Sequence, residues 1–358
     1  MPRLFNARHA DAADLAQCKA LLKGGSRSFH AASRILPASL HQPAGAVYAF
    51  CRLADDEIDN AIDNDAAPGS GAHGDAKAAL ERLRRRLELA YAGSPSAHPV
   101  DRAFADVVKR HDVPRALPEA LLEGFAWDAE GRRYETLSDV MAYAARVAGA
   151  VGAIMAVLMD RRESVTLARA CDLGCAMQLS NIARDVGEDA RAGRLYLPRD
   201  WMRAEGLDPE AFLADPVFSP ALARVVLRLL DEAEALYRRA DAGIAALPLA
   251  CRPGIFAARR MYAEIGHTVR LKGGNSVESR AVVSGRRKLA LLAQSVALSV
   301  VPHRRVTAQA LPETQFLVDA VQDALPPHAA LGRVGFTLSL FARLDQRDHE
   351  IGLRAARG

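Results

Sequence analysis

The segment ALARVVLRLLDEAEALYRRADAGIAAL, residues 221–247, determines the fold class expected for this chain. Its apolar residues recur at intervals of three and four, which is the periodicity of an amphipathic α-helix. The same pattern recurs along the chain over residues 11–22, 45–62, 75–92, 101–111, 137–160, 164–190, 252–271 and 285–301. No segment combines strict alternation with β-branched residues, as a half-buried strand would. The sequence therefore predicts an all-α protein, folded as a single large helical bundle.

The composition is that of a globular protein with a substantial core. Of the 358 residues, 50% are hydrophobic and 25% are charged, and the formal net charge is +4. No dense Lys/Arg block with interleaved aromatic residues is present, so we expect no nucleic acid partner. The longest apolar runs, 147–159 and 289–301, are shorter than the ~20 residues that span a bilayer. Because the N-terminus also lacks an apolar signal core, we expect a cytoplasmic protein, either soluble or peripheral at the inner membrane.

Two acidic motifs stand out, YAFCRLADDEIDNAID at residues 48–63 and SNIARDVGEDARAGRLYLP at residues 180–198. The oxygen-bearing side chains spaced four apart are Asp55, Asp59 and Asp63 in the first motif, and Asn181, Asp185 and Asp189 in the second. In a helix such residues share one face, and like charges at this spacing destabilise it by roughly 0.2–0.5 kcal/mol. An arginine precedes the first Asp of each pattern, namely Arg52 and Arg184.

A divalent cation bound between these carboxylates would neutralise the repulsion between them. Mg²⁺ is suited to this position, because it prefers carboxylates, waters and substrate phosphates as ligands. Two such helices facing each other could clamp a diphosphate between several metal ions, with arginines binding the remaining phosphate oxygens. Either motif alone is typical of a solvated helix face.

A ferritin-like di-iron site would need two Glu-x-x-His pairs, and only Glu264 and His267 fit. The glycine pattern at residues 69–74 follows no expected strand, so we attribute its likeness to a dinucleotide fingerprint to chance.

Several motifs together resemble the squalene/phytoene synthase family. DDEID (55–59) and NIARDVGED (181–189), followed by GRLYLP (193–198), are similar to its two aspartate-rich signatures. Further segments that resemble the family are SRSFHAASRILP (26–37), YAARVAGAVG (143–152) and residues 257–292. The resemblance covers roughly residues 15–300 and is closest to the bacterial, phytoene-forming branch.

The resemblance implies an isoprenoid synthase fold with a central cavity over residues 1–302. The C-terminal extension at 303–358 lies outside the resemblance, and its apolar pattern predicts two further amphipathic helices over residues 317–345. The implied reaction joins two molecules of geranylgeranyl diphosphate head to head. It passes through the cyclopropyl intermediate prephytoene diphosphate to 15-cis-phytoene and diphosphate, the first committed step of carotenoid biosynthesis. Other enzymes of that pathway and a membrane surface are implied as partners, and the tail is a candidate for the membrane contact.

The resemblance also assigns roles to individual residues. The expected ligands of Mg²⁺ or Mn²⁺ are Asp55, Asp59, Asn181, Asp185 and Asp189. The expected diphosphate-binding residues are Ser26, Ser28, Arg52, Arg184, Tyr262 and Arg280. The expected cavity lining is Phe29, Tyr48, Tyr143, Val147, Val151 and Gln178. Tyr143 is further expected to act in catalysis, by steering a proton toward departing diphosphate or by stabilising a cation with its ring; a buried structural tyrosine is the alternative.

Other interpretations stay open at this point. A squalene or dehydrosqualene synthase would use farnesyl diphosphate, and the depth of the cavity, which sets chain length, is not given by one sequence. A non-catalytic assembly protein of the same fold would have lost carboxylates, whereas all four Asp positions are intact here. The small residues of VAGAVGA (147–153) fit either room for prenyl chains or close helix packing. Cys51 and Cys175 are expected in the core, and His30, where the family often has an aromatic residue, has no assigned role.

Overall fold

The computed structural model describes residues 8–25, 27–65, 74–299 and 308–325. Every regular element in these ranges is helical, which confirms the all-α prediction. In chain order the helices are α1 (Ala12–Gly25), α2 (Arg27–Ser33), α3 (Ala38–Asp65), α4 (Asp75–Tyr91), α5 (Pro99–Arg110), α6 (Ala116–Ala129), α7 (Leu137–Ala144), the π-helical turn η1 (Ala145–Gly149), α8 (Ala150–Leu158), α9 (Ser164–Arg191), α10 (Arg199–Ala204), α11 (Pro209–Ala214), α12 (Pro220–Ile244), α13 (Arg252–Leu271), α14 (Gly285–Leu298) and α15 (Pro312–Asp323).

The amphipathic segment at 221–247 forms most of α12, as its spacing predicts. The helix begins where the Ser219 hydroxyl accepts a hydrogen bond from the Leu222 amide and Pro220 takes the first helical position. Its buried residues recur at the predicted intervals and include Leu222, Val226, Leu229, Ala233, Tyr237, Ala240 and Ile244. This face packs against α9.

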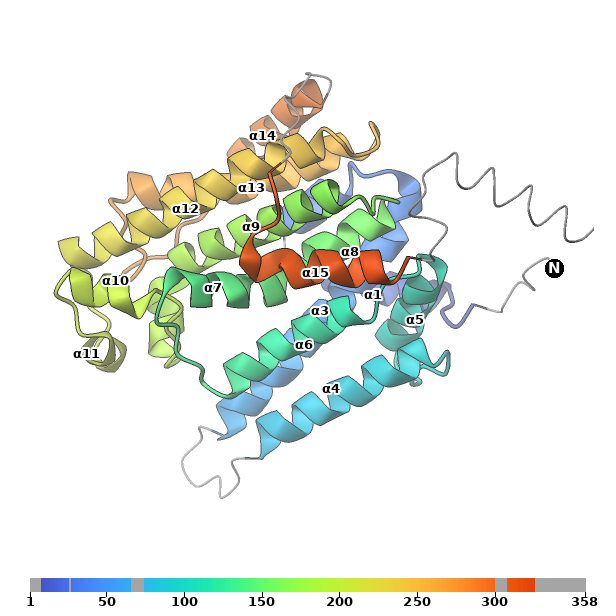
Figure 1. The fold of residues 1–358 in the computed structure, drawn as a ribbon, viewed down its shortest axis with the longest axis horizontal. Helices are drawn as coiled ribbons and strands as arrows, with labels where there is room; N and C mark the ends of the chain where they lie inside the picture. The colour runs from blue at the N-terminus through green and yellow to red at the C-terminus, as the bar shows by residue number, and fades with distance from the viewer. Residues whose placement is uncertain (1–7, 26, 66–73, 300–307, 326–358) are drawn as a thin grey trace, which may run out of the picture.

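Helix α9 lies at the centre of the bundle (Figure 1). It packs against η1 and α8 and also contacts α12, α13 and α15. Helix α3 lies in the lower layer of this view and packs against α1, α4, α5 and α6. Because α3 and α9 carry the two acidic motifs, the layered packing fixes the positions of both stripes of oxygen-bearing side chains.

Glycines allow η1 and α8 to approach α9 closely. A Cβ atom at Gly152 would lie 2.2 Å from the Ala170 carbonyl oxygen, and one at Gly174 would lie 2.2 Å from the Ala148 carbonyl oxygen. Both distances are far below van der Waals contact, so neither position tolerates a side chain without backbone movement. The small residues of the VAGAVGA segment therefore do serve close helix packing.

The stretch from α7 through η1 to α8 is longer than the apolar run recognised in the sequence. Among the described residues, Leu137–Leu158 is the helical stretch long and apolar enough to cross a membrane, with 22 residues and a mean hydropathy of 1.7. Of its most apolar 18-residue window, 67% is buried inside the protein, as in a core helix. Burial in the protein core is sufficient to explain why this stretch is apolar, and no membrane contact is needed to explain it.

Helix α6 was not predicted from periodicity. Its sequence, ALPEALLEGFAWDA, is apolar on nearly every side, and its buried residues include Leu117, Leu121, Leu122, Phe125 and Trp127. A helix buried on several sides lacks the polar stripe on which the periodicity argument depends. Helices α2, α10 and α11, of 7, 6 and 6 residues, were also not predicted because they are too short for a periodic signal.

The first part of the C-terminal extension packs onto the bundle. Helix α15 contacts α9, α6 and η1, and Leu317 on it is fully buried. Arg169 on α9 and Arg239 on α12 both donate hydrogen bonds to the Gln309 carbonyl oxygen, at 3.0 and 2.9 Å. Helix α15 begins at Pro312, five residues before the predicted stretch 317–345, and confirms helical structure only at the start of that stretch. Residues from 326 onward lie outside the described residues, and the domain boundary at residue 303 stays a prediction.

Candidate functional site

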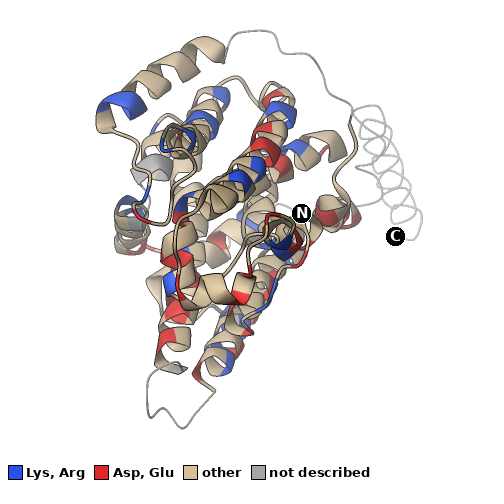
Figure 2. Cartoon of the chain, turned by 90° about the vertical axis from the view of Figure 1, so that its left-hand side faces the viewer, with Lys and Arg blue, Asp and Glu red and all other residues tan. Residues whose placement is uncertain are grey.

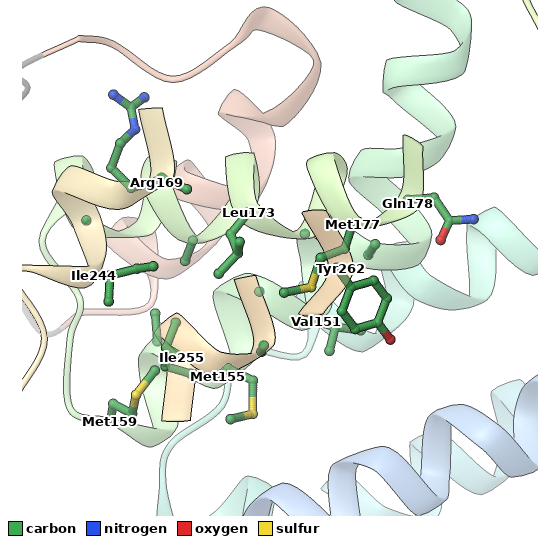
Figure 3. Close-up of a pocket in the computed structure, with 18 of the residues that line it drawn as sticks. Val151, Met155, Met159, Arg169, Leu173, Met177, Gln178, Ile244, Ile255 and Tyr262 are labelled. Atoms are coloured by element: carbon green, nitrogen blue, oxygen red, sulfur yellow. The ribbon is translucent and has the colours of Figure 1, made fainter. Parts of the chain in front are cut away.

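An elongated apolar cavity lies between the two helices that carry the acidic motifs. Its walls come from α3, η1, α8, α9, α12 and α13, and its volume is about 250 Å³. Side chains of Val151, Met155, Leu173, Met177 and Ile255 point into the common space (Figure 3).

The two ends of the cavity differ in chemistry. Gln178 and Tyr262 mark one end, and Met159, Ile244 and the stem of Arg169 mark the other (Figure 3). Asn181 also lines the cavity and lies one turn beyond Gln178 on α9, toward Asp185. The polar end therefore leads to the acidic motifs, and the apolar end leads into the interior of the bundle. This polarity suits a ligand with an anionic head and a long apolar tail.

A second hollow adjoins the polar end. It is lined by Arg52 and Asp55 of the first acidic motif, by Tyr143, and by Leu121 and Phe125 of α6. The residues that it shares with the main cavity are Tyr48, Cys51, Val147 and Gln178. Apolar space thus continues from the main cavity to the carboxylates of α3.

Arginines pair with the acidic motifs. Arg52 contacts Asp55 at 3.2 Å, and Arg194, just beyond α9, contacts Asp59 at 2.7 Å. Asp185 is shared between Arg184, at 2.5 Å, and Arg280, at 2.8 Å. The Arg194–Asp59 contact joins the end of the second motif to the first. Figure 2 shows this mixing on a wider scale, since acidic and basic residues are interleaved along the helices.

Two oxygen acceptors at the polar end are left without donors. The Asn181 Oδ1 atom is buried and has no hydrogen-bond partner. The Asp189 carboxylate has neither a hydrogen bond nor an ion pair among the described residues, and burial together with the Asp185 charge raises its pKa to about 7. Burial and the neighbouring Asp59 likewise raise the pKa of Asp55 to about 6. A buried amide oxygen without a donor, beside half-buried carboxylates that repel one another, is suited to a bound cation.

The geometry also limits what kind of metal site this is. Among the described residues, no three Asp, Glu, His or Cys side chains converge closely enough to form a metal centre by themselves. An all-protein cage of the zinc or calcium type is therefore not present in that part of the chain. Oxygen ligands contributed singly or in pairs by α3 and α9 fit Mg²⁺, which usually completes its shell with waters and substrate phosphates.

Most of the residues predicted for the site are brought together. The main cavity is lined by Tyr48, Val147, Val151, Gln178, Asn181 and Tyr262. The adjoining hollow adds Arg52, Asp55 and Tyr143, while Arg184 and Arg280 meet at Asp185. Ser26 lies outside the described residues, and the side chains of Ser28 and Phe29 on α2 do not belong to them either, so their assigned roles stay predictions.

His30 and the two cysteines have different surroundings. His30 lines a separate hollow between α1, α2 and α3, together with Lys19 and Arg34, and does not line the cavity. Cys175 is fully buried, as predicted for a core residue. Cys51 is only half-buried and forms part of the cavity wall. Burial raises the pKa of Cys51 to about 12, so its thiol is neutral.

Three residues at the site were missed in the sequence. Asp128 on α6 accepts hydrogen bonds from the Tyr143 hydroxyl at 2.9 Å and the Tyr196 hydroxyl at 2.7 Å. Arg194 and Tyr196 stand in the quoted GRLYLP segment but received no role. The available signal for Asp128 was a carboxylate in the otherwise apolar stretch GFAWDA (124–129), which is unusual unless the group is paired or functional.

The aromatic rings around Asp128 form a compact cluster. Tyr143 lies 5.0 Å from Tyr196 and 5.2 Å from Tyr134, measured between ring centroids. Tyr134 in turn lies 5.8 Å from Tyr196. Burial raises the pKa of Asp128 to about 6. The Tyr143 hydroxyl donates its proton to this carboxylate, and the expected catalytic role of Tyr143 stays a prediction.

Comparison with known proteins agrees with this geometry. Residues 22–288 match the protein family described as Squalene/phytoene synthase. A phytoene synthase of Rhodobacter capsulatus is 56% identical over 313 residues, covering 86% of this chain and 90% of that protein. A phytoene synthase of Cereibacter sphaeroides is 52% identical over 344 residues, covering 95% and 96%. A 15-cis-phytoene synthase of a Paracoccus species is 44% identical over 292 residues, covering 80% and 93%.

Solved structures extend the likeness to three dimensions. A dehydrosqualene synthase crystallised with a ligand superposes with a TM-score of 0.71 and 32% identity, covering 80% of this chain and 96% of that chain. A squalene synthase from Alicyclobacillus acidocaldarius superposes with a TM-score of 0.64 at 23% identity, covering 74% and 95%, and shows the shared fold. The predicted isoprenoid synthase fold is thereby confirmed.

Proposed function

The chain belongs to the squalene/phytoene synthase family, and from this premise we propose that it joins two molecules of geranylgeranyl diphosphate head to head, through prephytoene diphosphate, into 15-cis-phytoene. It is an enzyme of the phytoene synthase type. The observation that carries this conclusion is the identity of 56% and 52% to two phytoene synthases over most of the chain. The long apolar cavity with one polar end supports it, because the substrate has a C20 tail and an anionic head.

Loss of diphosphate from an allylic carbon creates an anion and a carbocation together. The groups that neutralise the anion are Arg52, Arg184 and Arg280, whose planar N–H forks match phosphate oxygens. The apolar walls exclude water, which would otherwise capture the cation. The cavity therefore separates the two products of ionisation, with the anion at the acidic end and the cation among the apolar side chains.

We propose that Asp55, Asp59, Asn181, Asp185 and Asp189 hold Mg²⁺ or Mn²⁺. The unpartnered Asn181 Oδ1 and Asp189 carboxylate support this assignment, as does the raised pKa of Asp189. When bound, the metal ions supply charge neutralisation for the departing diphosphate. Arg184 and Arg280 both pair with Asp185, which supports their proposed role beside the same anion.

We also propose that the protein works in the cytoplasm with a peripheral contact at the inner membrane, where other carotenoid-pathway enzymes would receive its product. A C40 hydrocarbon is soluble in lipid and not in water. Helix α14 supports such a contact, since Leu289 and Val296 on it are 68% and 52% exposed and basic residues lie at its start. Co-sedimentation with vesicles containing anionic lipid tests this contact; no binding at low salt would reject it.

A product assay tests the proposed function. Purified protein with Mg²⁺ and detergent receives geranylgeranyl diphosphate in one tube, and farnesyl diphosphate with and without NADPH in two others. A C40 hydrocarbon formed without NADPH is the expected result. A C30 product as the main hydrocarbon would instead assign a squalene or dehydrosqualene synthase, the activity of the solved relative at 32% identity. Folded protein that forms no hydrocarbon would favour a non-catalytic assembly role.

A further inference from the structure

One part of the cavity wall has an unusual helix geometry. The turn η1 (Ala145–Gly149) is π-helical, so its hydrogen bonds join residues five apart in place of four. Such turns are rare in proteins and are frequently found at functional sites. Val147 and Ala148 on η1 line the main cavity, and Val147 also lines the adjoining hollow. The π-helical turn is therefore part of the proposed substrate site.

The turn aligns side chains that lie before and after it. Tyr143, Val147 and Val151 are spaced four apart and run from α7 through η1 into α8. In a regular α-helix each residue adds about 100° of rotation, so the directions of Tyr143 and Val151 would differ by about 80°. A π-helix has more residues per turn, and a π-helical turn between the two residues reduces this difference. The turn thereby lines up the three side chains along the wall, where all three are found.

Helix α15 supports this turn from outside the cavity (Figure 1). Among the described residues, those that line the main cavity or the adjoining hollow include none from α15. Leu317 on α15 is fully buried and lies against the end of η1. A Cβ atom at Gly149 would lie 3.3 Å from the Leu317 Cδ1 atom. Any effect of α15 on the cavity must therefore act through η1 or its neighbours.

Arg146 forms a second connection between η1 and α15. Its guanidinium carbon lies 5.0 Å from the ring centroid of Phe316 on α15 and 4.2 Å from that of Trp127 on α6. Both distances are within the range of cation–π attraction. Arg146 also contacts Glu123 on α6 at 3.0 Å and donates a hydrogen bond to the Ala142 carbonyl oxygen at 3.1 Å. The second residue of η1 is thus held from α6, α7 and α15.

Polar contacts fix α15 relative to the elements on both sides of the turn. The Ser138 hydroxyl on α7 donates to the Glu313 carboxylate at 2.6 Å. The Gln309 carbonyl oxygen, just before α15, accepts hydrogen bonds from Arg169 on α9 and Arg239 on α12. Because α15 is bonded to the helices that flank η1, it can resist a rotation of the turn against them.

We propose that α15 is a positioning element for the proposed reaction, and that Leu317 and Phe316 act through η1 to keep the cavity wall aligned. The match to the family ends at residue 288, so α15 is an addition to the matched region. Without this support we expect η1 to relax toward α-helical geometry, which rotates Val151 relative to Tyr143 and admits water to the cavity. Water would then capture part of the carbocation. This inference rests on the proposed function and deepens it by naming the residues that keep the wall closed.

The test measures how diphosphate release is coupled to hydrocarbon formation in Leu317→Ala. Each phytoene is formed with two diphosphates, whereas a cation captured by water leaves a prenyl alcohol and diphosphate without hydrocarbon. We expect the ratio of diphosphate to phytoene to be at least about twofold higher in Leu317→Ala than in wild type, with prenyl alcohol accounting for the excess. The KM should stay close to that of wild type, because the groups proposed to bind diphosphate are unchanged.

Matched variants separate positioning from a loss of stability. Leu83→Ala removes another fully buried leucine, on α4, which lines neither cavity. It should lower the unfolding midpoint as Leu317→Ala does and keep the wild-type product ratio. Leu317→Met conserves most of the side-chain volume and should restore that ratio. A folded Leu317→Ala protein with the wild-type product ratio would overturn the proposal.

A milder variant covers the case in which Leu317→Ala does not fold. Phe316 is 37% exposed, so Phe316→Ala removes the ring beside Arg146 at little cost to the core. It must also raise the ratio of diphosphate to phytoene, and an unchanged ratio would overturn the proposal.

Hydrogen exchange without substrate keeps this inference distinguishable from the proposed function. The backbone amides of residues 145–152 should exchange faster in Leu317→Ala than in Leu83→Ala, because only the first variant loses support at η1. If wild type forms no C40 hydrocarbon, the proposed function fails, and faster exchange would still support the contact between α15 and η1. If wild type forms phytoene but neither the exchange nor the product ratio changes in Leu317→Ala, only the positioning role fails.

Discussion

Asp189→Asn is expected to stabilise the metal-free protein. Asp189 lies on α9, one turn beyond Asp185, and among the described residues its carboxylate has no ion-pair partner. Burial and the Asp185 charge raise its pKa from the usual 3.8 to about 7. The folded state therefore holds this group ionised at a cost, and asparagine of the same shape removes that cost.

The size and pH dependence of the effect follow from this pKa. Because the folded-state pKa is raised, the folded state binds the proton more tightly than the unfolded state, and stability declines as the pH rises from about 4 to about 7. A tenfold change in proton affinity equals about 1.4 kcal/mol. The upper limit at pH 8 is then about 4 kcal/mol, and we expect Asp189→Asn to gain roughly 2–4 kcal/mol there. At pH 5 the gain should fall to about 40% of that.

Urea unfolding in EDTA at pH 5 and pH 8 measures this difference, with Glu188→Gln as the control. Glu188 is the neighbouring carboxylate, but it is 52% exposed and contacts Arg280 at 3.3 Å, so its removal should not stabilise the protein. Adding Mg²⁺ and inorganic diphosphate should reverse the order, because ligands stabilise the state that binds them and wild type keeps all its ligands. If Asp189→Asn is no more stable than wild type in EDTA at pH 8, the repulsion argument is wrong.

Three further outcomes are expected. Asp55→Ala should abolish turnover with an unchanged helical circular dichroism spectrum, because it removes a metal ligand; wild-type rates at ordinary Mg²⁺ would contradict this. Arg280→Lys should raise the KM for geranylgeranyl diphosphate roughly tenfold through loss of the planar fork, and an unchanged KM would reject its placement. Gly174→Ala should destabilise the fold by about 1–3 kcal/mol, since its Cβ would meet the Ala148 carbonyl oxygen at 2.2 Å. Gly45→Ala, with no described atom within 4 Å of its Cβ, should instead add about 0.5–1 kcal/mol; identical urea midpoints for these two variants would refute the packing argument.

The sequence predicted the features that depend on residues repeating every three or four positions along a helix. Apolar spacing predicted α12, and the i, i+4 spacing of Asp185 and Asp189 predicted a shared helix face on α9. Local sequence rules are sufficient for these features, because neighbours in the chain are also neighbours on the helix. The roles of most cavity residues, including Tyr262 and Val147, came from family resemblance and not from periodicity.

The parts that were missed depend on tertiary packing. Asp128 lies 15 residues before Tyr143 and 68 residues before Tyr196, and no spacing rule connects them. The helix that carries it, α6, was itself missed because it is buried on several sides. The π-helical turn Ala145–Gly149, which adjusts the directions of the side chains between α7 and α8, has no signature in the sequence.

Metal binding with inorganic diphosphate tests the central claim most directly. Mn²⁺ binding is followed by electron paramagnetic resonance, with and without diphosphate, for wild type, Asp185→Ala and Glu188→Gln. The account predicts that diphosphate tightens Mn²⁺ binding to wild type and to Glu188→Gln, and that Asp185→Ala loses this effect. Equal diphosphate-dependent Mn²⁺ binding by Asp185→Ala and wild type would contradict the assignment of the acidic helices as a metal clamp.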